Sequence, residues 1–181
     1  MRSTMLYCIG ICLLISSCTS VPDNVRPVGE FELPRYLGTW YEIARFDHSF
    51  ERGLSEVTAT YSMRADGGVR VINKGYSQKK GEWDEAEGKA YFVSNSSTGH
   101  LKVSFFGPFY ASYVIMALDK ENYEYALITG PDKDYLWILA RTPSLPKQTV
   151  DKLITIAEQA GYDTNKFIWV EHTGNVVETT Q

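Results

Sequence analysis

Residues 56–74 read EVTATYSMRADGGVRVINK, and this stretch decides the fold. From residue 56 to residue 63, apolar side chains alternate with polar ones, which is the period-two pattern of a strand with one buried face. Asp66, Gly67 and Gly68 then give a hairpin-turn signal. Residues 69–74 follow as the partner strand. The stretch therefore predicts an antiparallel hairpin that buries one face.

Short strand-like segments continue on both sides of this hairpin. We expect eight strands in all, the other six near residues 40–46, 89–94, 101–106, 110–118, 123–129 and 135–140. Neighbouring strands must be antiparallel, because the connections are too short for helical crossovers. Eight meandering strands either form two packed sheets or close into a barrel, and closure removes both exposed edges.

One amphipathic helix is expected after the strands. Its apolar stripe recurs at i, i+3, i+4 and i+7, at Val150, Leu153, Ile154 and Ala157. Pro146 precedes this helix, and Gly161 stands where a helix commonly ends. Residues 167–170 then predict a last short strand. The helix can bury its stripe only against the outside of the strands.

The N-terminus has the layout of a secretory signal peptide, with Arg2, an apolar stretch over residues 5–15 and small residues before Cys18. It is shorter than the roughly 20 apolar residues of a membrane span. Residues 15–18, Ile-Ser-Ser-Cys, resemble the lipobox of bacterial lipoproteins, whose cysteine is acylated after cleavage. The alternative is ordinary secretion with an incidental cysteine. Cys8 and Cys12 fall in the removed part, so no internal disulfide is expected.

Removing residues 1–17 from the 181 leaves 164 residues, enough for one domain. We expect a lipidated tether over residues 18–30, a folded domain over 31–172 and a flexible tail over 173–181. The whole chain carries a formal net charge of −4. This mildly acidic balance argues against nucleic acid as a partner, because phosphate binding needs a positive surface.

Three motifs resemble the signatures of the lipocalins. The first is Gly38-Thr39-Trp40-Tyr41, the second is Asp134-Tyr135 with Lys133 where threonine is usual, and the third is Arg141-Thr142. Each motif is weak by itself. Together they occur in the family's order and spacing, are followed by the expected helix, and cover about residues 31–172. With the lipobox, the chain is most similar to the bacterial outer-membrane lipoprotein lipocalins.

The resemblance implies a definite fold and function. The fold is all-β, an eight-stranded antiparallel up-and-down barrel with one C-terminal α-helix packed outside. Trp40 would plug the closed end, with the Arg141 guanidinium stacked on its indole. Gly38, Asp134 and Tyr135 complete the structural signature. The protein would be anchored through Cys18 at the periplasmic face of the outer membrane. It would bind, store or transport fatty acids or lysophospholipids without a cofactor, and could pair as a homodimer.

Strand alternation predicts which side chains line the barrel. If Leu101, Val103 and Phe105 face inward, then Lys102 and Ser104 face solvent. On the next strand the inward set is either Tyr110, Ser112, Val114 and Met116 or Phe109, Ala111, Tyr113 and Ile115. We favour the first set, because a small serine and a flexible methionine suit a cavity that an acyl chain enters.

The last strand adds residues in phase with Arg141. The predicted ligand-binding set is therefore Phe105, Tyr110, Ser112, Val114, Met116, Trp137 and Leu139. Tyr110 and Trp137 would place polar tips near the mouth of the barrel. The alternative for both is that they merely fill the barrel.

No catalytic constellation stands out. The three histidines, His48, His100 and His172, are widely separated, lack metal-ligand spacing and are expected on the surface. The acidic run at Glu82, Asp84, Glu85 and Glu87 is expected to be a solvated charge run around a turn. We therefore expect neither a metal site nor an enzyme. The rival functions are a lipid-modifying lipocalin enzyme and an envelope scaffold whose barrel is blocked by Phe105, Met116 and Trp137.

Overall fold

A computed structural model describes residues 19–172. The predicted signal peptide, the predicted lipidation site Cys18 and the predicted tail over 173–181 lie outside the described residues. The elements in order are α1 (Leu33–Tyr36), β1 (Gly38–Arg45), β2 (Leu54–Met63), β3 (Val69–Ser77), β4 (Glu82–Phe92), β5 (His100–Ser104), β6 (Ala111–Leu118), β7 (Tyr125–Thr129), β8 (Leu136–Ala140), α2 (Lys147–Gln159), the 3-10 turn η1 (Thr164–Lys166) and β9 (Ile168–Trp169).

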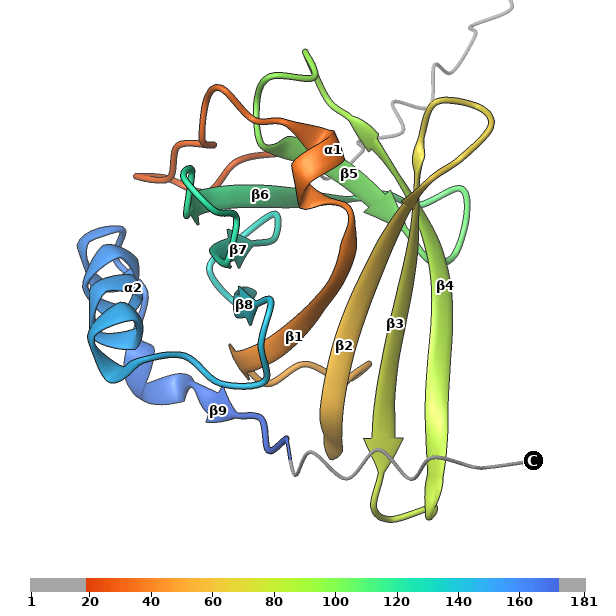
Figure 1. The fold of residues 1–181 in the computed structure, drawn as a ribbon, viewed down its shortest axis with the longest axis vertical. Coiled ribbons are helices and arrows are strands. Elements are labelled where there is room, and N and C mark those ends of the chain that lie inside the picture. The colour runs from red at the N-terminus through yellow and green to blue at the C-terminus, as the bar shows by residue number, and fades with distance from the viewer. Residues whose placement is uncertain (1–18, 173–181) are drawn as a thin grey trace, which may run out of the picture.

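The strands close into a barrel. Each of β2 to β8 pairs antiparallel with its neighbour in sequence, and β1 joins β8 to β2. The closing ladder sets Trp40 opposite Ala59 and Tyr41 opposite Thr58. The predicted eight-stranded antiparallel barrel is confirmed, with β9 as an added short strand on β1 (Figure 1).

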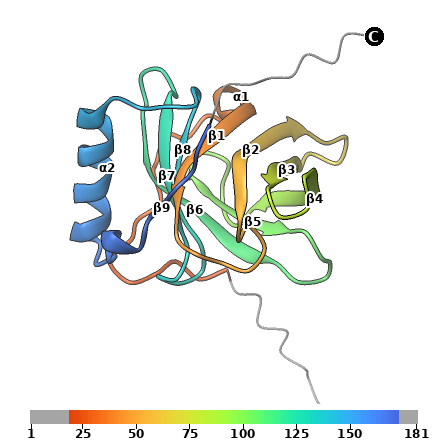
Figure 2. The same ribbon diagram turned by 90° about the horizontal axis from the view of Figure 1, so that it is seen from below.

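Helix α2 packs on the outside of the barrel, as predicted. Leu153 and Ala157 are buried in one cluster with Leu127 of β7 and Ile138 of β8. Viewed along the barrel, the helix lies beside these strands (Figure 2). No helix among the described residues is long and apolar enough to cross a membrane.

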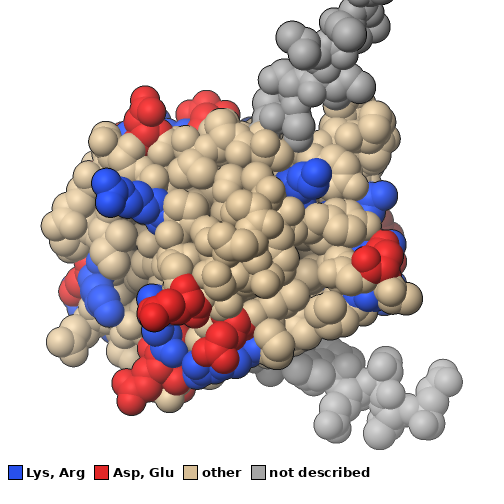
Figure 3. All heavy atoms as spheres, turned by 90° about the horizontal axis from the view of Figure 1, so that it is seen from above, with Lys and Arg blue, Asp and Glu red and all other residues tan. Residues whose placement is uncertain are grey.

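The end of the barrel near α1 is closed. Residues 33–36 form one turn of helix, with Pro34 in its first turn. Before it, Val28 donates its N–H to the carbonyl of Ile115 at 2.9 Å, so part of the predicted tether packs on the barrel wall. Seen from this end, the surface is largely uncharged, and acidic and basic side chains lie together near its edge (Figure 3).

The acidic run is solvated as expected, but its expected place around a turn is wrong. Glu82, Asp84, Glu85 and Glu87 belong to the first half of β4, and each pairs with a residue of β3. This half projects beyond the shorter strands of the barrel (Figure 1), and its side chains are largely exposed on both faces. A strand that is solvated on both faces shows no alternation, which explains why the pattern missed it.

Candidate functional site

Two apolar clusters separate the inside of the barrel from its outside. The inner cluster includes Trp40, Tyr61, Leu101, Ile128 and Leu139. The outer cluster lies under α2 and includes Ile43, Val114, Leu127, Ile138 and Leu153. Membership of a cluster therefore shows which way each strand residue faces.

The expected facing of β6 is wrong. Val114 is fully buried in the outer cluster and Met116 packs against it, whereas Tyr113 and Ile115 belong with the inner cluster. Ser112 hydrogen-bonds to the ring of His100 at 2.8 Å, on the same face as Val114. Tyr110 lies under the Lys102 ammonium, 5.2 Å from its ring centroid. The inward residues of β6 are thus Tyr113 and Ile115 of the alternative set, whereas Phe109 of that set is 75% exposed. The choice failed because α2 and the segment before α1 bury the outer face as well.

β5 and β8 face as expected, except that Ser104, expected to face solvent, is only 4% exposed on the outer face. Leu101 is buried in the inner cluster, and Phe105, Trp137 and Val103 pack against it. Leu139 is itself a buried member of that cluster. Contact of Phe105, Trp137 and Leu139 with a ligand stays a prediction.

The closed end is built around Trp40. Its side chain is fully buried, its indole N–H donates to the carbonyl of Tyr36 at 2.8 Å, and the Arg141 guanidinium lies 3.9 Å from its ring centroid. The same guanidinium donates to the carbonyls of Arg35 and Leu37, at the end of α1. Gly38 has a φ of +95°, and a Cβ there would lie 3.4 Å from Arg141. The predicted stacking of Arg141 on Trp40 is confirmed.

Three tyrosine hydroxyls meet inside the barrel above this floor. The hydroxyl oxygen of Tyr113 lies 2.8 Å from that of Tyr36 and 2.9 Å from that of Tyr61. Burial raises the pKa of all three phenols above the ordinary value, so they remain neutral hydrogen-bonding groups at pH 7. Each hydroxyl is partnered by another, and this lets the polar groups stay away from water.

A charged group occupies the barrel towards its other end. Glu42 and Arg45 of β1 stand opposite the inward Leu139 and Trp137, and they form a buried ion pair at 2.8 Å. Glu51 reaches in from the β1–β2 connection and accepts a hydrogen bond from the indole N–H of Trp137 at 3.2 Å. We call Glu42, Arg45 and Glu51 the mouth cluster.

Burial dominates the electrostatics of the mouth cluster. It raises the pKa of Glu42 well above the usual value, and the neighbouring Glu51 charge raises it further, against the effect of Arg45. Burial also raises the pKa of Glu51, while the hydrogen bond from Trp137 opposes this. Burial therefore opposes ionisation of both carboxyls, and the Arg45 charge favours it at both.

The three histidines are not on the surface, which corrects the prediction. His48 and His100 are 7% and 8% exposed, and the side chain of His172 is 3% exposed. His48 lies 3.1 Å from Glu51, but burial lowers its pKa to about 4, so it is neutral at pH 7 and this contact is no ion pair. The described residues hold no group of three or more His, Cys, Asp or Glu side chains able to bind a metal.

Sequence reasoning missed the mouth cluster. Glu42 is two residues from Trp40, so alternation alone places it inside. Arg45 departs from that phase because the pairing with β8 shifts between Glu42 and Ala44. Glu51 lies in a connection, where no periodicity points inward. Asp134 and Tyr135 flank the same end, where Tyr135 stacks on Trp137 with centroids 6.0 Å apart.

These features define a closed-end antiparallel barrel with an inward-facing apolar wall and two internal polar groups. Barrels of this kind hold one small ligand. The chain belongs to the lipocalin family, because the sequence model of the lipocalin-like domain matches residues 31–172.

Relatives in bacteria and animals agree with this assignment. The chain is 56% identical over 166 residues to outer membrane lipoprotein Blc of Vibrio cholerae, covering 92% of this chain and 97% of that one. It is 54% identical over 164 residues to outer membrane lipoprotein Blc of Escherichia coli K12, covering 90% and 92%. Mouse apolipoprotein D is 37% identical over 161 residues, covering 84% and 80%.

Solved structures share the fold at lower identity. Insecticyanin of the tobacco hornworm superposes with a TM-score of 0.69 at 24% identity, covering 85% of this chain and 87% of that one. Lobster apocrustacyanin A1 gives a TM-score of 0.61 at 20% identity, covering 86% and 95%. At this level the likeness shows the barrel fold alone.

Proposed function

We propose that this protein is an outer-membrane-anchored carrier that binds a fatty acid or a lysophospholipid inside its barrel. The observation that carries the proposal is the inward apolar wall between the tyrosine hydroxyls and the mouth cluster. A hydrocarbon chain gains by contact with such a wall. The polar groups at each end restrict where a lipid's polar part can lie. The names of the bacterial relatives support the location in the outer membrane.

Mass spectrometry of lipids extracted from natively purified protein tests ligand binding. We expect a single-chain lipid to co-purify with the wild type. The matched control is Val103→Trp, which adds volume at a half-buried inward position. This variant should retain its melting temperature and lose the lipid. Wild-type protein that carries no more lipid than the variant would refute the carrier function.

The membrane anchor is tested separately. Labelled palmitate should mark the wild type and not Cys18→Ala, and the variant barrel should stay folded because the anchor and the domain are separate. A Cys18→Ala protein that still fractionates wholly with outer membranes after high-salt washing would show that the lipobox interpretation is wrong.

We further propose that the protein releases its ligand unchanged and is not an enzyme. A turnover assay on the co-purified lipid distinguishes the two, because a carrier returns the ligand with its covalent structure intact. The scaffold alternative assumed that Phe105, Met116 and Trp137 block the barrel together. Met116 faces the outer cluster, so this blocking set does not assemble.

A further inference from the structure

Strand β4 changes its neighbours halfway along its length. Residues 89–92 pair with β5, whereas residues 82–88 pair only with β3 among the strands that the structure describes. β5 ends at Ser104, and the chain then enters the connection to β6. On this side the first half of β4 therefore has no backbone ladder, which leaves a gap in the strand pairing beyond Lys89.

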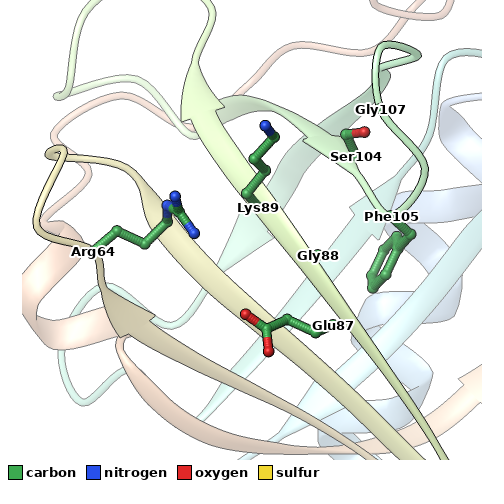
Figure 4. Close-up of a pocket in the computed structure, with 7 residues that line it drawn as sticks. All are labelled: Arg64, Glu87, Gly88, Lys89, Ser104, Phe105 and Gly107. Carbon is green, nitrogen blue, oxygen red and sulfur yellow. The ribbon is translucent and has the colours of Figure 1, made fainter.

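A pocket of about 160 Å³ lies where this gap begins. Its lining comes from β4, from the end of β5 and the connection that follows, and from Arg64 after β2 (Figure 4). Lys89 and Ser104 are directly paired across β4 and β5, so both belong to the same face of the sheet. That face is the outer one, because their neighbours Ala90 and Val103 pack in the inner cluster.

One basic side chain at this pocket has no acidic partner among the residues that the structure describes, whereas the other charged side chains form ion pairs. Arg64 is paired with Asp66 at 2.9 Å, and Glu87 is paired with Arg70 at 2.6 Å. The Lys89 side chain has no ion-pair or hydrogen-bond partner among residues 19–172. Two neutral pairs and one unpaired ammonium make the pocket positive, which favours an anion.

Ser104 provides a second, independent sign of a ligand. The residue is only 4% exposed, and its Oγ has no hydrogen-bond partner within the described part of the chain. A buried hydroxyl without a partner is costly, because folding removes its water and replaces it with nothing. An anion oxygen in the pocket would accept the hydrogen bond that this hydroxyl lacks.

Phe105 connects the pocket to the inside of the barrel. Its side chain lines the pocket and also packs against the inner cluster. The ring lies so close to β4 that a Cβ at Gly88 would come within 2.9 Å of it. Glycine at this position therefore lets the aromatic ring lie in the wall. The ring therefore stands between the outer pocket and the inner cluster.

We propose that this pocket is a lateral headgroup subsite, in which Lys89 and Ser104 bind the phosphate of a single-chain lipid whose hydrocarbon chain passes Phe105 into the barrel. The subsite rests on the proposed carrier function. The mouth cluster offers two carboxyls and one guanidinium, so an anionic headgroup is less well accommodated there than beside an unpaired ammonium.

Calorimetric titration with three probes tests the subsite. Dodecyl phosphate carries both the chain and the anion, 1-dodecanol carries the chain alone, and inorganic phosphate carries the anion alone. The variants are Lys89→Gln and Ser104→Ala, and the matched control is Lys102→Gln, which removes the same charge from the neighbouring strand. Ser104→Ala should not lower the melting temperature, because it removes an unsatisfied hydroxyl.

We expect Lys89→Gln to weaken dodecyl phosphate binding by about tenfold and Ser104→Ala by a few-fold. Binding of 1-dodecanol should be unchanged in both variants, and Lys102→Gln should bind all probes like the wild type. Equal effects of Lys89→Gln and Lys102→Gln would overturn the subsite, while undiminished 1-dodecanol binding would leave the carrier function standing.

Two further outcomes also overturn the proposal. If inorganic phosphate binds through Lys89 as tightly as dodecyl phosphate does, the pocket is a site for a free anion and the chain adds nothing. If neither dodecyl phosphate nor 1-dodecanol binds to the wild type, the carrier function fails and the subsite fails with it.

Discussion

The two ends of the barrel bury polar groups in opposite ways. At the closed end, the Arg141 guanidinium stacks on Trp40 and donates to backbone carbonyls, and the tyrosine hydroxyls satisfy one another. At the mouth, the Arg45 guanidinium donates to the Glu42 carboxylate and to the backbone carbonyl of Glu51, and burial raises the pKa of both carboxyls. The polar groups of the closed end are therefore all hydrogen-bonded and serve the structure. The mouth instead buries ionisable carboxyls whose pKa values are shifted. Buried ionisable groups with perturbed pKa values are typical of a functional site.

The largest effect is expected from breaking the closed end. Trp40→Ala should cost about 3–5 kcal/mol of the free energy of unfolding, because it empties a fully buried aromatic site. Urea denaturation measures this cost. Trp169→Ala is the matched control, since Trp169 is 51% exposed and should lose much less. Similar losses in the two variants would contradict the assignment of Trp40 as the plug.

The stacking of Arg141 on Trp40 should account for a smaller part of the free energy of unfolding. A double-mutant cycle of Trp40→Ala and Arg141→Ala should give a coupling of about 0.5–2 kcal/mol, the range for a cation–π pair. Additive losses would show that the two side chains are close without stabilising each other.

At the mouth, the raised pKa of Glu42 should make the free energy of unfolding depend on pH. Glu42 has a raised pKa in the folded state, so its stabilising contribution is present below the usual value of 4.5 and is lost as the pH rises through the folded pKa. His48 acts in the opposite direction. Its pKa falls from 6.5 to about 4, so its contribution is present above 6.5 and is lost as the pH falls towards 4.

Urea denaturation at several values between pH 4.5 and 6.5 separates the two groups. Glu42→Gln should make the slope of the free energy of unfolding against pH more positive, by at most about 1.4 kcal/mol per pH unit. His48→Gln should make the slope more negative. Unchanged slopes in both variants would show that the mouth cluster titrates like exposed groups.

The smallest effect concerns the lining of the barrel near the mouth. Trp137→Ala should weaken binding of a single-chain lipid several-fold, because the side chain packs on the inner cluster and its N–H holds Glu51. Tyr110→Ala and Lys102→Ala should leave lipid affinity unchanged, since these side chains lie together outside. Weaker binding in Lys102→Ala, equal to that in Trp137→Ala, would invert the assignment of the inner face.

Alternation predicted the barrel wherever one face of a strand meets solvent, as in residues 56–63. It failed where that condition failed. On β6 both faces are buried, so pattern could not choose between Val114 and Ile115, and a preference for Ser112 and Met116 misled the choice. In the first half of β4, both faces are solvated and the strand was read as a turn.

The mouth cluster could not be predicted from the sequence, for a different reason. Glu51 enters the barrel from a connection, and its place depends on the Trp137 indole 86 positions later in the chain. Such long-range contacts follow from strand closure and have no local signal. The signature residues Trp40 and Arg141, in contrast, could be paired because the resemblance to the family supplied that contact.

The central claim is that a hydrocarbon chain lies inside the barrel, and quenching by a brominated fatty acid tests it most directly. Native mass spectrometry first establishes that 9,10-dibromostearate binds to the wild type, Trp137→Phe and Trp169→Phe. The account predicts saturable quenching of tryptophan emission that is much weaker in Trp137→Phe, where Trp40 at the closed end is the remaining tryptophan of the inner cluster, and that is retained in Trp169→Phe, because Trp169 is 51% exposed. Quenching that persists in Trp137→Phe and disappears in Trp169→Phe would place the chain outside the barrel and contradict the account.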